Sequence, residues 1–332
     1  MSTRTITVAG AGITGLWQAL TLARRGHRVR LIERASEPFA LSASAYAGAM
    51  LAPYCETEAA APVILDLGVE GIRLWRENFP GTAMQGSLVV AAARDAGEIE
   101  RFARLTQGHT RLDGAAIGKL EPDLEARFAT GLFYAGEAHV APRDGMRFVL
   151  EEARRTGVEA VFGAEWPQAG SKSDIVVDCR GMGARGELAD LRGVRGERLV
   201  LRTREIGFKR PVRLLHPRHS IYIVPWGDGL FMLGATVIES DDAGPVTVRS
   251  ALELLGSAYA LHPAFAEAEI VDIGAGVRPA FADNVPKIVV RGSTLHVNGL
   301  FRHGFLLAPA LAIRVADYLE TGAIDDRVFV VA

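Results

Sequence analysis

The chain has 332 residues, of which 49% are hydrophobic and 23% charged, and its formal net charge is −2 at pH 7. This composition is typical of a soluble globular protein large enough for two lobes, and the near-neutral charge favours neither nucleic acid nor an acidic membrane as a partner. The two cysteines, Cys55 and Cys179, stand in no CxxC or metal-ligand pattern, so neither a disulfide framework nor a zinc site is expected.

The first predicted unit is a strand, a glycine-rich turn, a helix and a second strand within residues 6–33. The turn reads Gly10-Ala11-Gly12-Ile13-Thr14-Gly15. In such a βαβ unit Gly10 permits the tight turn, Gly12 lets the backbone approach a pyrophosphate, and Gly15 lets the helix pack closely on the strand. The pattern therefore predicts an adenine-dinucleotide site with the phosphates at the helix N-terminus.

An acidic residue ends the second strand of this unit. Glu33 lies 18 residues after Gly15, where a carboxylate can accept hydrogen bonds from both ribose hydroxyls. No hydrophobic signal-peptide segment precedes the first strand, so a reduced, cytoplasmic location is expected.

A run of small residues follows at positions 42–53. It reads Ser42-Ala43-Ser44-Ala45-Tyr46-Ala47-Gly48-Ala49-Met50-Leu51-Ala52-Pro53. A bulky flavin ring requires small side chains where the backbone passes it closely. The segment therefore favours FAD over NAD as the dinucleotide.

Two later segments, residues 85–95 and 195–240, alternate polar and apolar residues as antiparallel strands do. Residues 220–225 and 230–234 flank a glycine turn at 227–229, which predicts a hairpin. By the same alternation Tyr222 shares a strand face with Val224.

Three apolar runs, at residues 160–162, 174–179 and 294–299, are predicted to be further strands of the nucleotide-binding sheet. The second run leads into Gly181-Met182-Gly183, a turn of the kind that approaches a cofactor. These signals predict an α/β fold in which a doubly wound, Rossmann-like FAD-binding domain is interleaved with an antiparallel-sheet α+β substrate domain. The expected boundaries are 1–75, 141–190 and 270–332 for the FAD-binding domain, and 76–140 and 191–269 for the substrate domain.

The last apolar stretch, residues 305–319, is interrupted by Pro309, Arg314 and Asp317. No uncharged apolar run reaches about 18 residues, so no membrane span is expected. The stretch is instead predicted to form an amphipathic C-terminal helix.

Several of these segments together resemble the FAD-dependent D-amino-acid oxidase and glycine oxidase family, and in particular the glycine oxidase branch that serves thiamine thiazole biosynthesis. The resemblance extends from residue 5 to about residue 320. It is carried by the small-residue run and by three later motifs: Tyr222-Ile223-Val224-Pro225 with Leu233-Gly234-Ala235-Thr236, Gly276-Val277-Arg278-Pro279 with Asp283 and Pro286, and the segment from Phe301 to Pro309.

The resemblance implies roles for three residues in catalysis. Arg278 would anchor the substrate carboxylate, since an arginine fork binds carboxylates bidentately. Tyr222 would donate its hydroxyl to the same carboxylate, and Arg302 would either add positive charge or hold the loop. The alternatives are an arginine that bridges two strands and a tyrosine that is part of the core. Glu56 could meet a substrate ammonium, although a solvated loop position is the favoured interpretation.

The resemblance also implies which residues contact FAD. Val161 would do so through its backbone at the adenine end, and His303 and Gly304 would do so at the start of the last helix. The complete expected set is Gly10, Gly12, Ile13, Thr14, Gly15, Glu33, Arg34, Ser42, Ala43, Ser44, Ala47, Gly48, Met50, Leu51, Val161, Gly181, Arg278, Arg302, His303, Gly304, Phe305 and Leu306. No cysteine lies in the context of the covalent-flavin sarcosine oxidases, so non-covalent FAD is expected and no metal is.

The implied reaction is the oxidative deamination of glycine or another small amino acid or secondary amine, with dioxygen as acceptor and hydrogen peroxide as product. Ser220 and Val237 stand where the family often has histidine and methionine, which weakens an assignment to glycine itself. A D-amino-acid or amine dehydrogenase with another acceptor, a tRNA-modifying oxidase domain and a non-catalytic flavin protein are the alternatives. The resemblance leads us to expect a homo-oligomer. We expect neither a nucleic acid nor a membrane as a partner.

Overall fold

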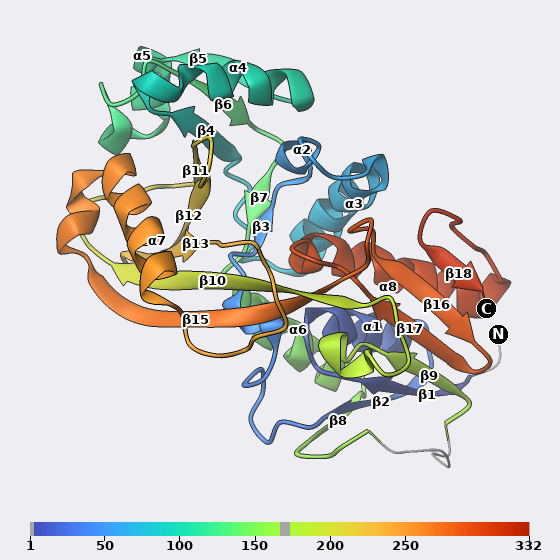
Figure 1. The fold of residues 1–332 in the computed structure, drawn as a ribbon. Helices are drawn as coiled ribbons and strands as arrows, with labels where there is room; N and C mark the ends of the chain where they lie inside the picture. Colours follow the sequence, from blue (N-terminus) through green and yellow to red (C-terminus); the bar gives the residue numbers. More distant parts are fainter. Residues whose placement is uncertain (1–2, 167–172, 332) are drawn as a thin grey trace.

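The computed structural model describes residues 3–166 and 173–331 and contains two large sheets (Figure 1). The first sheet has seven strands in the order β18-β16-β17-β9-β1-β2-β8. They are β1 (Thr5–Ala9), β2 (Arg28–Glu33), β8 (Glu159–Phe162), β9 (Ile175–Asp178), β16 (Lys287–Arg291), β17 (Thr294–Asn298) and β18 (Phe329–Val331). The pairs β1–β2, β1–β9, β2–β8 and β9–β17 are all parallel, which confirms the prediction that these distant segments share one nucleotide-binding sheet.

The second sheet has nine strands, eight of them in the order β14-β10-β13-β12-β11-β4-β6-β5, with β15 paired to β10. They are β4 (Ser87–Ala91), β5 (Thr110–Asp113), β6 (Thr130–Tyr134), β10 (Arg192–Arg202), β11 (Val212–Leu215), β12 (Ile221–Gly227), β13 (Leu230–Gly234), β14 (Ile238–Glu239) and β15 (Glu269–Ala280). The predicted hairpin is confirmed, because β12 and β13 pair antiparallel. The pairing of β4 with β11 is the parallel exception in this otherwise antiparallel sheet.

Helices pack against both sheets. They are α1 (Ile13–Arg24), α2 (Pro53–Glu56), α3 (Pro62–Asn78), α4 (Ala96–Leu105), α5 (Gly114–Leu120), α6 (Pro142–Arg155), α7 (Val248–Leu261) and α8 (Gly304–Thr321). Single 3₁₀ turns are η1 (Ala43–Tyr46), η2 (Ala93–Asp95), η3 (Pro122–Leu124), η4 (Gly181–Ala184) and η5 (Pro263–Glu267). A two-stranded ribbon of β3 (Met50–Leu51) and β7 (Ala138–His139) completes the fold.

The largest hydrophobic core lies around the first sheet, where α1, α3, α6 and α8 pack together. The predicted C-terminal helix is confirmed as α8, which is more buried than expected: its first half is buried on every side between α1 and α3, and its second half keeps a partly exposed face that includes Arg314 and Asp317. Its first turns are made of apolar and small residues that allow close packing on both neighbours. Among the described residues, no helix is both long enough and apolar enough to cross a membrane.

The two longest strands connect the sheets in space. Figure 1 shows β10 and β15 side by side, extending from the second sheet toward the first, and their register pairs Val194 with Arg278 and Gly196 with Gly276. Residues 276–279, at the end of β15, line the same cavity as Gly10, after β1, and Tyr222, in β12. The division of the chain into two discontinuous domains stays a proposal. Strand β15, residues 269–280, belongs to the nine-stranded sheet.

Candidate active site

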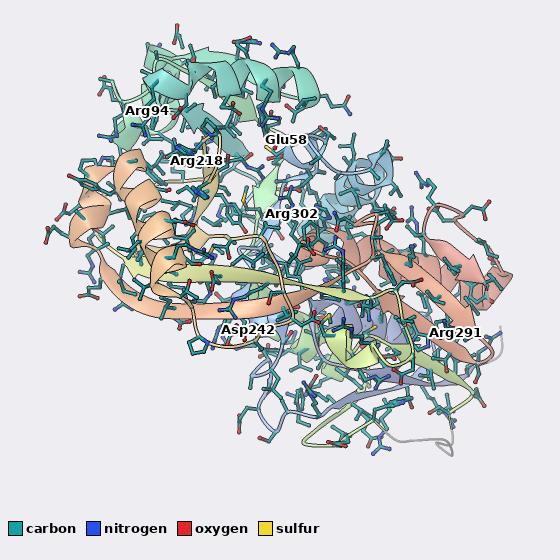
Figure 2. All side chains as sticks on the ribbon, in the orientation of Figure 1. Glu58, Arg94, Arg218, Asp242, Arg291 and Arg302 are labelled. Carbon is teal, nitrogen blue, oxygen red and sulfur yellow. The ribbon has the colours of Figure 1, made fainter. Side chains whose placement is uncertain are left out.

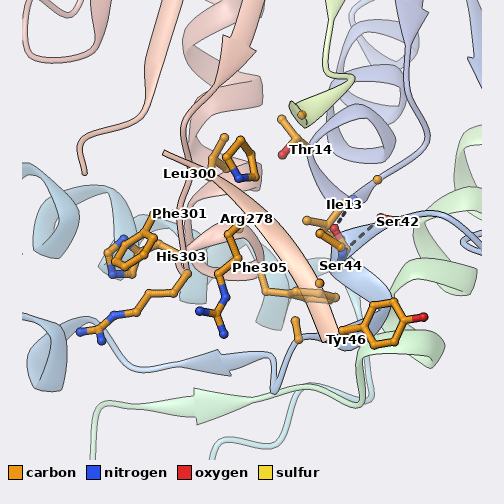
Figure 3. A pocket seen from close by; sticks show the side chains of 18 of the residues that line it. Ile13, Thr14, Ser42, Ser44, Tyr46, Arg278, Leu300, Phe301, His303 and Phe305 are labelled. Carbon is orange, nitrogen blue, oxygen red and sulfur yellow. Dashed lines mark hydrogen bonds between the residues drawn. The ribbon is translucent and has the colours of Figure 1, made fainter. Parts of the chain in front are cut away.

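A cavity of approximately 670 Å³ lies where elements of the two sheets meet. Its wall is formed by the β1–α1 turn, the small-residue run, β12, β15, η4 and the start of α8. Figure 3 shows the labelled side chains of Ile13, Ser44, Tyr46, Arg278 and His303 around this space. Segments from both ends of the chain and from its middle therefore contribute to one site.

The nucleotide end of the cavity has the geometry that the glycine turn predicted. Gly10 has φ +93°, and a Cβ at this position would lie 2.8 Å from the Cys179 carbonyl oxygen. Only glycine adopts such a backbone conformation there without strain. The backbone N–H of Ile13, at the start of α1, donates to Ser44 Oγ at 3.2 Å, so the small-residue run lies directly against the helix N-terminus (Figure 3).

Glu33 is held at this end by backbone donors. Its Oε2 accepts from the N–H of Ala11 at 2.8 Å, and its Oε1 accepts from the N–H of Ala35 at 3.0 Å. Each carboxylate oxygen retains a further lone pair for another donor. An oriented carboxylate beside a glycine turn and a helix N-terminus fits the ribose and phosphates of an adenine dinucleotide.

The small-residue run provides room at the centre of the cavity. A Cβ on Gly48 would lie 2.8 Å from Cε2 of the Tyr222 ring and 3.2 Å from Met232 Sδ. Gly48 therefore lets the tyrosine ring of the second sheet approach the first domain closely. Ala47 and Met50 also line the cavity, so a broad planar group meets little steric obstruction there.

Arg278 projects from β15 into the cavity (Figure 3). Its Nη1 donates to the Thr236 carbonyl oxygen at 3.1 Å, and a Cβ on Gly196 would lie only 1.9 Å from its Nη2. The guanidinium thus lies over the bare backbone of Gly196. Burial lowers the pKa of Arg278, with Tyr222 and Glu56 acting in the opposite direction, but an arginine keeps its charge at neutral pH.

Glu56 is buried, and the favoured interpretation of it as a solvated loop residue is wrong. Its Oε2 accepts from Arg302 Nε at 2.7 Å and His303 Nε2 at 2.9 Å, and its Oε1 accepts from Arg213 Nη2 at 3.2 Å. Burial by itself raises the pKa of Glu56, but Arg302, His303 and Arg213 together hold it well below the ordinary value. Glu56 is therefore an ionised carboxylate within the protein interior.

A second buried carboxylate, Glu137, contacts Cys55, the residue that precedes Glu56. Its Oε1 accepts from the N–H of Cys55 at 2.7 Å, and its Oε2 accepts from the hydroxyl of Ser87. Burial raises the pKa of Glu137 to about 7, only partly countered by these donors and by Arg213. Burial also raises the pKa of the thiols of Cys55 and Cys179, so neither is a thiolate at neutral pH.

Most of the residues expected to contact FAD do line the cavity. They are Gly10, Gly12, Ile13, Thr14, Glu33, Arg34, Ser42, Ala43, Ser44, Ala47, Gly48, Met50, Gly181, Arg278, Arg302, His303, Gly304, Phe305 and Leu306, and Tyr222 lines it as well. Gly15, Leu51 and Val161 lie outside the wall. Gly15 faces the Gly10 carbonyl beneath the turn, Leu51 is fully buried, and Val161 pairs with Ile32 at the sheet edge.

Other lining residues were not found from the sequence, among them Tyr46, Trp166, Arg213 and Asn298. The available signal for Arg213 was a charge inside the apolar strand Val212–Leu215. Tyr46 stands within the small-residue run, but as its one bulky residue it had no signal of its own, and Asn298 stands in a segment that reads as an ordinary strand. Within the described residues, no group of three or more His, Cys, Asp or Glu side chains could hold a metal ion.

Comparison with known proteins identifies similar chains along the whole length. A family model described as FAD dependent oxidoreductase matches residues 5–318. A Rhizobium etli protein assigned as the thiamine biosynthesis oxidoreductase ThiO is 52% identical over 320 residues, covering 95% of this chain and 96% of the relative. Glycine oxidase of Geobacillus kaustophilus is 25% identical over 358 residues, covering 95% of this chain and 92% of that protein.

Solved structures show the same fold at lower identity. The crystal structure of the Geobacillus kaustophilus glycine oxidase matches with a TM-score of 0.80 and 22% identity, covering 96% of this chain and 95% of that chain. An iminodiacetate oxidase from Chelativorans matches with a TM-score of 0.79 and 22% identity, covering 95% of each chain.

Proposed function

Because the chain belongs to the FAD dependent oxidoreductase family of the D-amino-acid oxidase type, we propose that it catalyses the oxidative deamination of glycine or another small amino acid or secondary amine. The products are a 2-oxo acid, ammonia or an amine, and hydrogen peroxide formed from dioxygen. The high identity to a thiamine biosynthesis oxidoreductase supports a role in supplying thiamine thiazole.

The observation that supports this proposal best is the position of Arg278 and its lack of a carboxylate partner in the described part of the chain. Its guanidinium points into the cavity and donates to a backbone carbonyl, while no carboxylate pairs with it among residues 3–166 and 173–331. A charged fork with unused donors at a cavity wall is a strong site for an incoming carboxylate. Glu56 is close enough to influence the pKa of Arg278 but is bonded to other residues.

The residues of the chain orient the substrate rather than perform acid–base chemistry. Arg278 binds the carboxylate and Tyr222, on the neighbouring wall, donates its hydroxyl to it, which fixes the direction of the substrate Cα–H bond. The substrate amine reacts in its neutral form. When bound, FAD supplies the two-electron acceptor for the oxidation of that amine.

Other cavity residues fit the FAD molecule that the family uses. Gly10, Gly12 and Glu33 would hold the adenosine and the pyrophosphate, and the small-residue run would accept the ring system. Helix α8 begins at Gly304 on the cavity wall, so its N–H groups and positive dipole end favour negative charge there. We place the FAD as non-covalent, and the enzyme as a cytoplasmic homo-oligomer, on the resemblance to glycine oxidases.

The proposal is tested by mixing the FAD-loaded protein, without oxygen, with glycine, sarcosine, D-alanine and D-proline. Rapid loss of the long-wavelength absorbance of oxidised flavin with glycine or sarcosine, followed by peroxide when air is readmitted, is the expected result. Bleaching without peroxide would replace dioxygen by another acceptor. Absence of bleaching with every free amino acid would contradict the proposed substrate class.

A further inference from the structure

Three arginines line the cavity near Tyr222, and they are not equivalent. Arg302 binds Glu56 through Nε at 2.7 Å and Nη2 at 2.5 Å, and Arg213 binds the same carboxylate at 3.2 Å. Arg278, in contrast, donates to the carbonyl oxygen of Thr236. One buried carboxylate therefore engages two of the three cations.

We infer that Glu56 determines the specificity of this site for substrates that carry a single carboxylate. Its charge engages Arg302 and Arg213, so Arg278 is the one of these three arginines that has no carboxylate partner within residues 3–166 and 173–331 and is ready to receive a substrate carboxylate. This inference rests on the proposed function, because it concerns amino-acid substrates at the same cavity. It assigns to Glu56 a role in excluding a second acidic group.

Glu56 is fixed in the place where it has this effect. It is the last residue of α2, which begins with Pro53, and the N–H of the preceding Cys55 donates to the buried Glu137. Its Oε2 also accepts from the buried ring of His303. The side chain therefore has little freedom to move away and release Arg302 to another carboxylate.

The carboxylate of Glu56 already engages the donors that a second acidic group on the substrate would need. A second carboxylate at Arg302 would have to lie against the ionised carboxylate of Glu56 or displace it, and two like charges at that distance repel each other. Glu58 also lines the cavity, and its carboxylate pairs with Arg101 at the exposed surface of α4. Figure 2 labels Glu58 near α2 and Arg302 below it. A monocarboxylate meets only Arg278 and avoids both acidic residues.

The first test uses unmodified holoenzyme and two non-oxidisable ligands of nearly equal size, malonate and monomethyl malonate. Dissociation constants are measured from the change in flavin absorbance on titration at constant ionic strength. The monoester is expected to bind at least as tightly as malonate. Malonate binding about tenfold tighter, the effect of one additional charge-assisted hydrogen bond, would overturn the inference.

The second test changes the carboxylate itself. Glu56→Gln is expected to shift the ratio of the two dissociation constants at least about tenfold toward malonate, because Arg302 loses its ionic partner. The matched control is Glu137→Gln, which removes a buried carboxylate near Arg213 that does not line the cavity, and it should leave the ratio unchanged. An unchanged ratio in Glu56→Gln, or an equal shift in Glu137→Gln, would contradict the inference.

These titrations require no turnover, so they remain informative if no amino acid is oxidised. In that case the function proposed above fails, while the ligand preference is still measured. If Glu56→Gln does not retain FAD, tighter binding of malonate by the unmodified holoenzyme would still overturn the inference.

Discussion

Replacing Gly196 by alanine should displace the substrate anchor, Arg278, without replacing Arg278 itself. A Cβ at this position would lie 1.9 Å from Nη2 and 2.1 Å from Cζ of Arg278. Carbon and nitrogen atoms that are not bonded to each other separate to about 3.5 Å. The guanidinium must therefore move by roughly 1.5 Å, since the backbone of β10 is fixed between β13 and β15.

A displacement of this size has a predictable kinetic effect. Misplacing a substrate-positioning group by about 1 Å costs on the order of 100-fold in rate, which corresponds to about 2.7 kcal/mol. We expect Gly196→Ala to bind FAD normally and to lose about 100-fold in kcat/KM for glycine. The assay is oxygen uptake or peroxide formation under steady-state conditions, with the FAD content checked by absorbance.

The control for Gly196→Ala is Gly207→Ala, at a loop position where an added Cβ would meet nothing within 4 Å. That variant should retain the kcat/KM of the unmodified protein. If Gly196→Ala, with full FAD content, had a kcat/KM within about threefold of the control, the bound position of the Arg278 guanidinium could not be the one described here.

Three further outcomes are expected. Arg278→Ala should retain FAD but lose roughly 3 kcal/mol of transition-state stabilisation, seen as a fall in kcat/KM on every amino-acid substrate, and near-normal turnover would refute its role as anchor. The pKa of Glu137 is raised to about 7 from an ordinary 4.5, so the folded state favours the protonated carboxyl. The free energy of unfolding, relative to that of Glu137→Gln, should therefore be greatest below pH 4.5 and fall by roughly 3 kcal/mol as the pH rises through 7. A pH-independent difference between the two proteins in urea unfolding would contradict this. Gly256→Ala, inside α7 with no atom within 4 Å of the added Cβ, should raise the free energy of unfolding by about 0.5–1 kcal/mol, and a lower Tm would show that the space is not open.

The candidate site divides into a part that local sequence revealed and a part that it did not. Local sequence revealed the glycine turn, Glu33 and the small-residue run. Each of them answers a steric or hydrogen-bonding requirement of the cofactor that falls on neighbouring residues of one segment. The hairpin that contains Tyr222 was found from its two-residue alternation and its glycine turn. The expectation for Glu56 failed because nothing near position 56 in the chain indicates burial or a basic partner.

The cofactor turn, the parallel strands around it and the family of the chain could all be predicted from the amino-acid sequence, because these features depend on local backbone conformation and on the periodicity of apolar residues. The ionised state of the buried Glu56, and the lack of a carboxylate partner for Arg278 in the described part of the chain, emerged from the folded arrangement. Glu56 lies 157 residues from Arg213 and 246 from Arg302, and the folded chain brings them together at 3.2 and 2.7 Å. Ion pairing in a protein interior depends on such distances and on the exclusion of water, and neither is encoded by the spacing of residues along the chain.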